Sequence, residues 1–198
     1  MIAIFDYGSG NLKSAQRAFA STGWNVVVTS DTEVATRAKG LVIPGVGAFG
    51  ACMAQLISAG GDELINNRIS SGDPILGICV GMQILFSSSS EKGEHKGLGV
   101  VAGEIRKLDN KVLPHIGWNT LTIDSTSRLF KGIEEESFYF VHSYAANQGV
   151  EGAANSYSEY GESFLAAFEK GPVSATQFHP EKSGTAGLRM ISNWVDSL

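Results

Sequence analysis

One segment of the chain, Gly77-Ile78-Cys79-Val80-Gly81, has the spacing of a nucleophile elbow, with a glycine two residues to either side of a nucleophile. Small residues at these positions let the chain turn sharply where an apolar strand gives way to a helix. A cysteine at a helix N-terminus also lies beside free backbone N–H groups, which favours the reactive thiolate. The pattern predicts Cys79 as a nucleophile and the Val80 amide as an oxyanion donor. The alternative is a buried, purely structural cysteine.

A cysteine nucleophile needs a base, and the base needs an acceptor that orients it. Of the four histidines, His179 stands at the end of an expected strand, and Glu181 follows two residues later. Strand geometry points both side chains to one side, although Pro180 bends the path. We therefore expect His179 to be the base and Glu181 its acceptor. The alternative is a surface histidine beside a turn.

A second glycine-rich turn, Pro44-Gly45-Val46-Gly47, follows another apolar strand. Its glycines would let the backbone approach a substrate and turn an N–H group toward an oxyanion, or they simply form a strand-to-helix turn. The loop at positions 7–11 lacks the complete phosphate-binding patterns, so nucleotide binding is not expected there. Cys52 stands in an apolar helical stretch and is expected in the core.

The first half of the chain alternates elements that could position these residues. Apolar runs at 2–7, 24–28, 41–43 and 75–78 predict strands, and positions 12–21 have helical spacing. Because these strands are continuously apolar, they are expected in a mostly parallel sheet that helices cover on both faces. The fold class is therefore α/β.

The second half of the chain is richer in strands. The serine run at 87–90 is expected to be a solvated helix end or a loop. Positions 185–197 carry apolar residues on one face and predict a closing amphipathic helix. No linker separates the halves, so residues 1–198 are expected to form one domain. Strand-like runs occupy 100–108, 113–123, 138–144, 164–169 and 175–179.

Composition excludes several classes of function. The chain has 198 residues with 15 basic and 20 acidic side chains, and its net charge of −5 disfavours nucleic acid as a partner. No apolar run approaches the roughly 18 residues that span a membrane, and the N-terminus does not read as a signal peptide. Two cysteines and no Cys/His set with zinc spacing predict neither a metal nor another cofactor. A cytoplasmic location is the simplest expectation.

The turn, the elbow with its continuation Met82-Gln83, and the distal His-Pro-Glu occur in the order typical of class I glutamine amidotransferases, the triad glutaminases. The chain resembles this family over essentially its whole length. Three segments are further similar to the glutaminase subunits of imidazole glycerol phosphate synthases: Asp-Tyr-Gly-Ser-Gly-Asn at 6–11, Pro-His-Ile-Gly-Trp-Asn at 114–119 and Tyr-Phe-Val-His-Ser-Tyr at 139–144. The resemblance implies the three-layer fold of that family and an enzyme that hydrolyses L-glutamine to glutamate and ammonia.

The resemblance also implies a role for each matching residue. Cys79, His179 and Glu181 form the triad, and the Val80 amide and the turn of Gly45, Val46 and Gly47 stabilise the oxyanion. Gln83, Glu91 and Ser143 hold glutamine, with Glu91 facing the α-ammonium group. A (β/α)₈-barrel cyclase subunit is the implied heterodimer partner, and it faces Gly10, Asn11, His115, Trp118 and Asn119. Spacing alone leaves open that Trp118 is a core residue.

A separate partner also follows from chemistry, because ammonia released into neutral water mostly becomes ammonium, a poor nucleophile. The chain has no room for a synthase domain of its own, and its activity is expected to depend on the partner through reorganisation of the Val46 turn. Two alternatives remain. A thiol peptidase could use the same elbow and histidine, but it would not need Gln83 or segment 114–119. The other alternative is a non-catalytic interaction subunit with the same fold.

Overall fold

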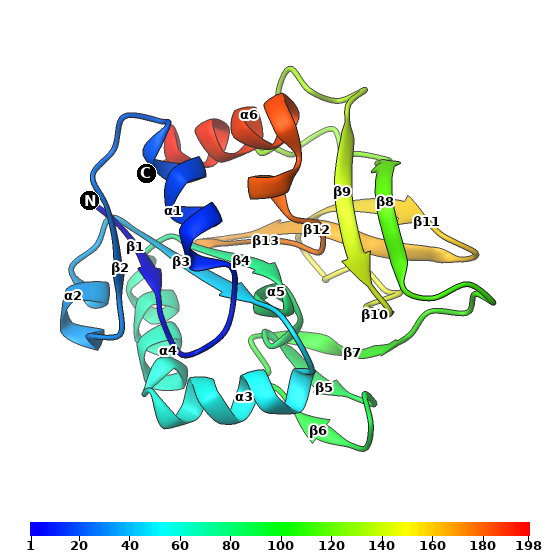
Figure 1. Cartoon of the computed structure of the whole chain (residues 1–198), viewed down its shortest axis with the longest axis horizontal. Helices are drawn as coiled ribbons and strands as arrows, with labels where there is room; N and C mark the ends of the chain where they lie inside the picture. Colours follow the sequence, from blue (N-terminus) through cyan, green and yellow to red (C-terminus); the bar gives the residue numbers. More distant parts are fainter.

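A computed structural model describes residues 1–198 and places a seven-stranded sheet at the centre of the protein (Figure 1). The sheet order is β11-β12-β13-β4-β3-β1-β2. Pairing is parallel from β2 to β13 and antiparallel between β13 and β12 and between β12 and β11. The strands are β1 (Ile2–Phe5), β2 (Val26–Thr29), β3 (Gly40–Gly45), β4 (Ile75–Cys79), β11 (Ala154–Glu159), β12 (Ser163–Lys170) and β13 (Val173–Thr176).

Helices cover both faces of this sheet (Figure 1). The helices α1 (Leu12–Ala20) and α6 (Gly184–Val195) lie together on one face, and α3 (Phe49–Ser58) and α4 (Gly61–Ser71) lie on the other. Shorter helices are α2 (Thr32–Thr36), α5 (Val80–Gln83) and the 3₁₀ turn η1 (Pro180–Lys182). The predicted α/β class, with a mostly parallel sheet between helical layers, is confirmed. No helix combines the length and apolar character needed to cross a membrane.

The strand-rich second half adds two smaller sheets beside the central one. The four-stranded sheet has the order β10-β7-β5-β6, and β8 pairs with β9 in an antiparallel two-stranded sheet. In Figure 1 the β8–β9 sheet stands above the β11–β12 end of the central sheet. The strands are β5 (Phe86–Ser89), β6 (His95–Lys96), β7 (Val101–Lys107), β8 (His115–Thr120), β9 (Ser137–His142) and β10 (Tyr144–Ala145).

Two local expectations differ from the structure. The serine run at 87–90, whose polarity indicates a loop or a solvated helix end, belongs mostly to β5, which pairs in parallel with β7. Ser89 is fully buried there and accepts a hydrogen bond from the Glu91 amide, so a polar sequence hid a paired strand. The sequence contains no clear signal for β11, because this edge strand of the central sheet carries mostly polar side chains.

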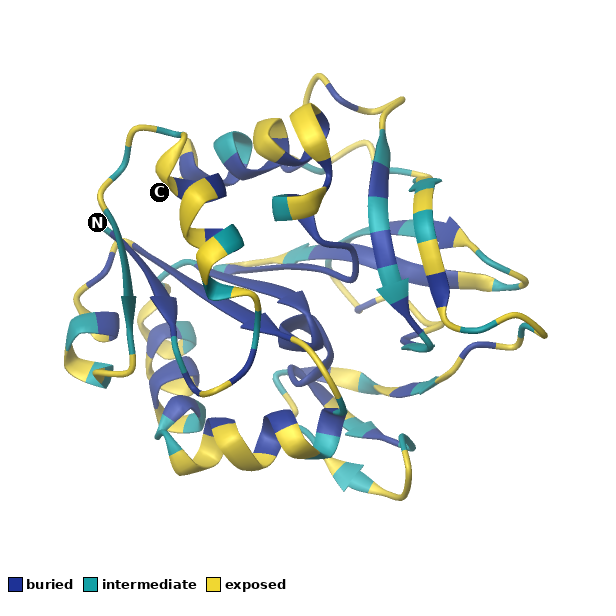
Figure 2. Ribbon diagram, viewed as in Figure 1, coloured by how far each residue is buried: buried dark blue, intermediate teal, exposed yellow.

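The core joins all these layers. Fifty-two buried apolar residues form one cluster, which includes every residue of β1 and the Leu41–Ile43 part of β3 (Figure 2). Continuous burial explains why these strands read as unbroken apolar runs. The parallel strands β3 and β4 end side by side at Gly45 and Cys79, which are register partners. Both predicted turns therefore open at the same edge of the sheet.

Candidate active site

The elbow at Cys79 depends on its glycines. Cys79 has φ 56° and ψ −113°, and Lys92 is the only other non-glycine residue with positive φ. A Cβ at position 81 would lie 1.8 Å from the Ile43 carbonyl oxygen, and one at 77 would lie 2.6 Å from the Gly81 oxygen. Neither strand nor helix backbone can yield that much space. The sequence therefore forces Cys79 into a strained conformation at the carboxyl end of β4, as active sites often do.

His179 and Glu181 come from the segment that follows β13. The His179 amide donates to the Tyr139 carbonyl (2.9 Å), and the Ser183 hydroxyl donates to the His179 carbonyl (2.6 Å), so the backbone is held on both sides. His179 Nδ1 lies 2.8 Å from Glu181 Oε1, and the two side chains are 2% and 4% exposed. Glu181 thus fixes the ring orientation, as an orienting acceptor should.

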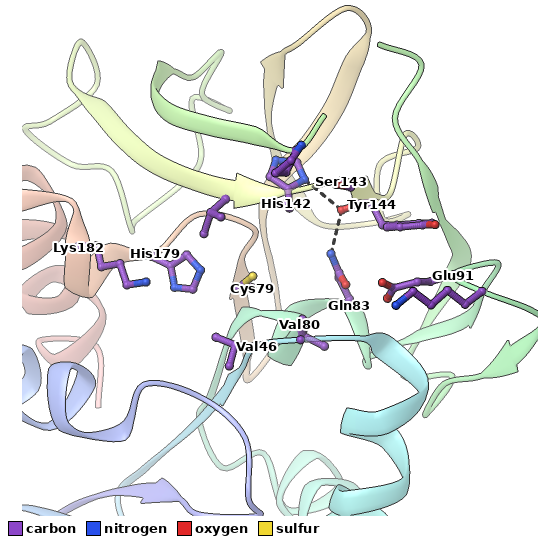
Figure 3. A pocket seen from close by; sticks show the side chains of 14 residues that line it. Val46, Cys79, Val80, Gln83, Glu91, His142, Ser143, Tyr144, His179 and Lys182 are labelled. Carbon is purple, nitrogen blue, oxygen red and sulfur yellow. Dashed lines mark hydrogen bonds between the residues drawn. The ribbon is translucent and has the colours of Figure 1, made fainter. Parts of the chain in front are cut away.

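The other ring nitrogen of His179 lies on the side of Cys79 (Figure 3). This Nε2 atom is buried and has no hydrogen-bond partner within the protein, as expected of a ring nitrogen that exchanges a proton with a ligand. Burial alone would lower the pKa of His179, but its interactions with Cys79 and Glu181 raise the pKa to about 10. The imidazole therefore holds a proton at neutral pH when it faces a thiolate. Cys79, His179 and Glu181 are brought together in a buried arrangement suited to nucleophilic catalysis.

A cavity of about 420 Å³ opens over Cys79 and His179 (Figure 3). It is lined by residues from both glycine-rich turns, the loop after β5, and the ends of β9 and β10. Most residues predicted for substrate and oxyanion meet here, namely Val46, Gly47, Val80, Gln83, Glu91 and Ser143. Gly45 lies behind them, where a Cβ would come within 2.7 Å of the Gly81 amide nitrogen.

The Val46 turn differs from the expectation that its amide is free to bind an oxyanion. The Val46 N–H donates to Ser9 Oγ (3.0 Å), and the Ser9 hydroxyl donates back to the Val46 carbonyl (2.9 Å). The Cys52 thiol donates to the same carbonyl (3.2 Å), and burial raises the pKa of this thiol, which keeps its proton in place. Cys52 is in the core, as predicted, but it also holds the turn.

The two predicted glutamine-binding side chains are each partly engaged. Glu91 Oε2 accepts from the Phe49 amide (2.7 Å), which caps α3 because Ala48 has no capping side chain. The Gln83 amide nitrogen donates to the Tyr144 carbonyl and to Gln177 Oε1, both at 2.9 Å. Each residue therefore keeps one oxygen free for a ligand, Glu91 Oε1 and Gln83 Oε1.

The residues predicted to face a partner separate into two groups. Trp118 is 58% exposed, so the alternative that it is core is wrong, and Asn11 is exposed while it caps α1 through Ser14. Asn119 donates to the Glu159 carbonyl (2.8 Å). His115 is 3% exposed and stacks on Tyr160, so the placement of its side chain at a surface is wrong. Strand alternation explains this, because His115 and Trp118 lie on opposite faces of β8.

His115 is half of a buried histidine pair. Its Nδ1 lies 3.1 Å from His142 Nε2, and His142 Nδ1 lies 3.0 Å from the Tyr144 carbonyl oxygen. Burial lowers the pKa of His115 to about 4 and that of His142 to about 3, against 6.5 for an ordinary histidine. Both rings are therefore neutral at pH 7. The carbonyl can only accept, so Nδ1 of His142 carries the proton and its Nε2 accepts from His115.

This pair predicts loss of stability in mild acid. Below pH 6.5 the two histidines bind more protons in the unfolded chain than in the folded protein. The free energy of unfolding is therefore highest above that pH, and it falls as the pH drops toward 4 and 3. His179 does not mask this, since its opposite contribution is lost only as the pH rises through about 10. Denaturant unfolding of wild type measures this free energy at each pH. Between about pH 6.5 and 5, each of the two rings should lower the free energy of unfolding by up to about 1.4 kcal/mol for every pH unit.

The matched variant for this measurement is His115→Phe, which keeps an aromatic ring between Phe140 and Tyr160. Its unfolding free energy should depend less steeply on pH over the same interval. An unfolding free energy of wild type that does not change over this interval contradicts the assignment of two neutral rings.

Sequence reasoning missed several residues of the site. Gln177 is fully buried and donates to Cys79 Sγ (3.7 Å), and Ser9 holds the Val46 turn. The signal for Gln177 is its position in the predicted strand 175–179, two residues before His179, so that strand alternation points both side chains to the same face. Lys92 and Lys182 also line the cavity. No group of three or more His, Cys, Asp or Glu side chains is arranged to hold a metal ion.

Known sequences match this chain closely. The family model "Glutamine amidotransferase class-I" matches residues 3–198. The "Imidazole glycerol phosphate synthase subunit HisH" of Nocardia farcinica is 51% identical over 206 residues, covering 100% of this chain and 98% of that protein. The proteins of the same name from Mycobacterium tuberculosis H37Rv and Streptomyces coelicolor are 50% and 46% identical, with 100% of this chain covered and 98% and 93% of theirs.

Solved structures show the same fold at low sequence identity. A glutamine amidotransferase crystal structure has a TM-score of 0.79 at 18% identity and covers 98% of this chain and 97% of its own. The structure of PurLQS from Thermotoga maritima contains a chain with a TM-score of 0.74 at 17% identity, with 99% and 97% covered. Together with the sequence matches, these show that the chain belongs to the class I glutamine amidotransferases, among the HisH subunits of imidazole glycerol phosphate synthase.

Proposed function

We propose that this chain hydrolyses L-glutamine to L-glutamate and ammonia, and that a (β/α)₈-barrel cyclase subunit uses the ammonia to make imidazole glycerol phosphate in histidine biosynthesis. The family supports the reaction and the need for a synthase partner. The single observation that carries the assignment of residues is the buried set of Cys79, His179 and Glu181 at the floor of the cavity. No step requires a metal ion or another cofactor.

In the first half-reaction, the Cys79 thiolate attacks the side-chain carboxamide carbon of glutamine. The carbonyl π electrons move to oxygen, and the Val80 N–H at the start of α5 donates to this oxyanion, since the first N–H groups of a helix have no intrahelical partner. The tetrahedral intermediate then collapses with cleavage of the C–N bond. Protonated His179 gives its Nε2 proton to the departing nitrogen, so that ammonia leaves and a thioester remains.

In the second half-reaction, His179 acts as a base. Its Nε2 takes a proton from a water molecule, and the hydroxide attacks the thioester carbon. The C–S bond breaks, glutamate leaves, and the pair of thiolate and imidazolium returns. Glu181 keeps Nδ1 protonated in both halves, because its carboxylate accepts from that nitrogen.

Substrate orientation is assigned to the two free oxygens described above. Glu91 Oε1 and Gln83 Oε1 can both accept from the α-ammonium group of glutamine, and Ser143 lies at the same cavity wall. Gln83 has no N–H left to offer a carboxylate, because its amide nitrogen already donates twice. The side chain therefore acts on substrate only as an acceptor.

The partner surface is assigned to the exposed part of β8 and to the N-terminal loop. Trp118 and Ile116 are 58% and 59% exposed on the same face of β8, and tryptophan is a residue type enriched at interfaces. Gly10 and Asn11 lie in the loop between β1 and α1. Ser9 of this loop is hydrogen-bonded to Val46, so a partner that binds the β1–α1 loop also lies on the side of the protein that carries the Val46 turn.

The proposed function is tested by the dependence of hydrolysis on the partner. The Val46 amide is bound to Ser9, so the second oxyanion donor must be released before it can act. One such donor contributes on the order of 10²- to 10³-fold in rate. We expect the isolated chain to hydrolyse glutamine slower by about this factor than the complex with the barrel subunit and its nucleotide substrate.

Steady-state glutamate production measures this ratio. Equal rates with and without the partner contradict the coupling. The peptidase alternative is tested in the same assay, because a peptidase would cleave peptides and leave free glutamine intact. The same complex should convert the nucleotide substrate to imidazole glycerol phosphate with glutamine as the only nitrogen source.

A further inference from the structure

Gln177 places an amide against the sulfur of the nucleophile. It lies between β13 and His179, is 0% exposed, and does not line the cavity. Its Nε2 donates to Cys79 Sγ at 3.7 Å, and its Oε1 accepts from Gln83 at 2.9 Å. A buried amide needs partners for both ends, and here one of the partners is the reacting atom itself.

The orientation of this amide is determined by a chain of hydrogen bonds that has one possible direction. The chain begins at the Tyr144 carbonyl oxygen, which can only accept. Gln83 must therefore turn its amide nitrogen toward Tyr144 (2.9 Å), and its second N–H meets Gln177 (2.9 Å). That N–H requires an oxygen as partner. Gln177 consequently presents Oε1 to Gln83 and Nε2 to Cys79.

The starting carbonyl is held from a second side by the histidine pair. His142 Nδ1 donates to Tyr144 O at 3.0 Å, and the neutral His142 ring accepts at Nε2 from His115 at 3.1 Å. Both rings are buried. The carbonyl thus receives two donors, Gln83 and His142, and its position does not depend on substrate.

The two possible orientations of the Gln177 amide have opposite electrostatic effects on Cys79. An N–H group facing the sulfur stabilises negative charge there, whereas a carbonyl oxygen repels it. Deducing from this network, we propose that Gln177 stabilises the Cys79 thiolate as a hydrogen-bond donor, and that Gln83 is the positioning residue that keeps the Gln177 amide in this orientation. The inference rests on the proposed function, because it assigns further residues to the same nucleophile.

The test uses the pH profile of alkylation of Cys79 by iodoacetamide, followed by site-resolved mass spectrometry on the full-length chain. Alkylation needs the thiolate and no glutamine, so it reports on the sulfur alone. Gln177→Met keeps the length of the side chain and removes the donor. The midpoint of the profile should rise by about one pH unit or more, as expected for one hydrogen bond to a charged atom.

Turnover in the complex with the barrel subunit gives a second readout. In Gln177→Met, kcat for glutamine hydrolysis should fall about tenfold or more with little change in KM, because Gln177 does not line the cavity. A purely structural role of Gln177 would alter stability without moving the alkylation midpoint. Unchanged alkylation and kcat in a folded Gln177→Met protein overturn the inference.

Gln83→Met tests the positioning step. Its alkylation midpoint should rise like that of Gln177→Met, because the Gln177 amide loses the partner that fixes its orientation. The double variant should show no larger rise than Gln177→Met alone, since both changes act through one hydrogen bond. If the shift of the double variant equals the sum of the two single shifts, Gln83 does not act on Cys79 through Gln177.

Thr176→Val is the matched control. Thr176 is also fully buried and precedes Gln177, but its hydroxyl donates to the Phe178 carbonyl (3.1 Å). Its alkylation profile should equal that of wild type, and a comparable shift would show general loosening and contradict the inference. The proposed function has its own test, because it is contradicted if the wild-type complex makes no glutamate from glutamine. In that case the alkylation shifts, which are measured without glutamine, still test the hydrogen bond from Gln177 to Cys79.

Discussion

Replacing Cys79 with alanine is expected to abolish glutamine hydrolysis, in the isolated chain and in the complex with the proposed barrel subunit. Without the sulfur no thioester can form, so the two-step acyl transfer loses its nucleophile. Alanine fits the elbow, because it is smaller than cysteine and does not disturb the flanking glycines. Glutamate release measured in a coupled assay should fall to the background of the enzyme-free reaction.

External ammonium is the control for the Cys79→Ala complex. The partner's synthesis reaction should proceed when ammonium salts replace glutamine, because the partner and the interface are unchanged. Loss of both reactions would show that the variant fails to assemble. Glutamine hydrolysis at the wild-type rate would remove Cys79 from the mechanism altogether.

Replacing His179 with asparagine is expected to reduce kcat by about 10²- to 10⁴-fold, the usual contribution of general acid–base catalysis. The variant keeps a polar side chain beside Glu181 but can neither protonate the leaving nitrogen nor deprotonate water. It also removes the imidazolium that faces the sulfur, whose pKa is raised to about 10 in the wild type. Steady-state rates with saturating glutamine measure the effect on the chemical steps.

His95→Asn is the matched control for His179→Asn. His95 lies in β6, packs against Phe49 and Gly50, and does not line the cavity. Its substitution should leave the rate close to that of wild type. If both variants lose activity equally, the loss reflects general damage and not the role of His179 as acid and base.

Much of the fold could be predicted because buried strands and amphipathic helices produce local patterns of apolar residues in the sequence. Buried parallel strands such as β1 and β3 must be continuously apolar, and this signal is strong over even four residues. β5 and β11 gave no such signal, because serine-rich strands obtain their stability from backbone pairing with β7 and β12. β11 pairs with β12 in a tight hairpin, where Glu159 lies opposite Ser163, but backbone pairing does not depend on apolar side chains, so the apolar pattern cannot reveal it.

The candidate site divides in the same way. The elbow could be predicted because Gly77 and Gly81 are required by steric contacts inside one short segment. The hydrogen bond from the Val46 amide to Ser9 could not, since the two residues are 37 positions apart and meet only through folding. The resemblance of segment 114–119 predicted His115 at a partner surface, but the alternation of β8 turns its side chain inward. Residue type and segment are readable from sequence, whereas side-chain direction needs the sheet.

The central claim is that Cys79 attacks glutamine, and affinity labelling tests this claim most directly. A diazo-ketone analogue of glutamine carries an electrophilic carbon where the substrate has its carboxamide. After incubation of the complex with this analogue, mass spectrometry should find the label on the Cys79 peptide alone, in proportion to lost activity, and glutamine should protect against it. Label on any other residue, or complete inactivation with Cys79 unmodified, would contradict the mechanism.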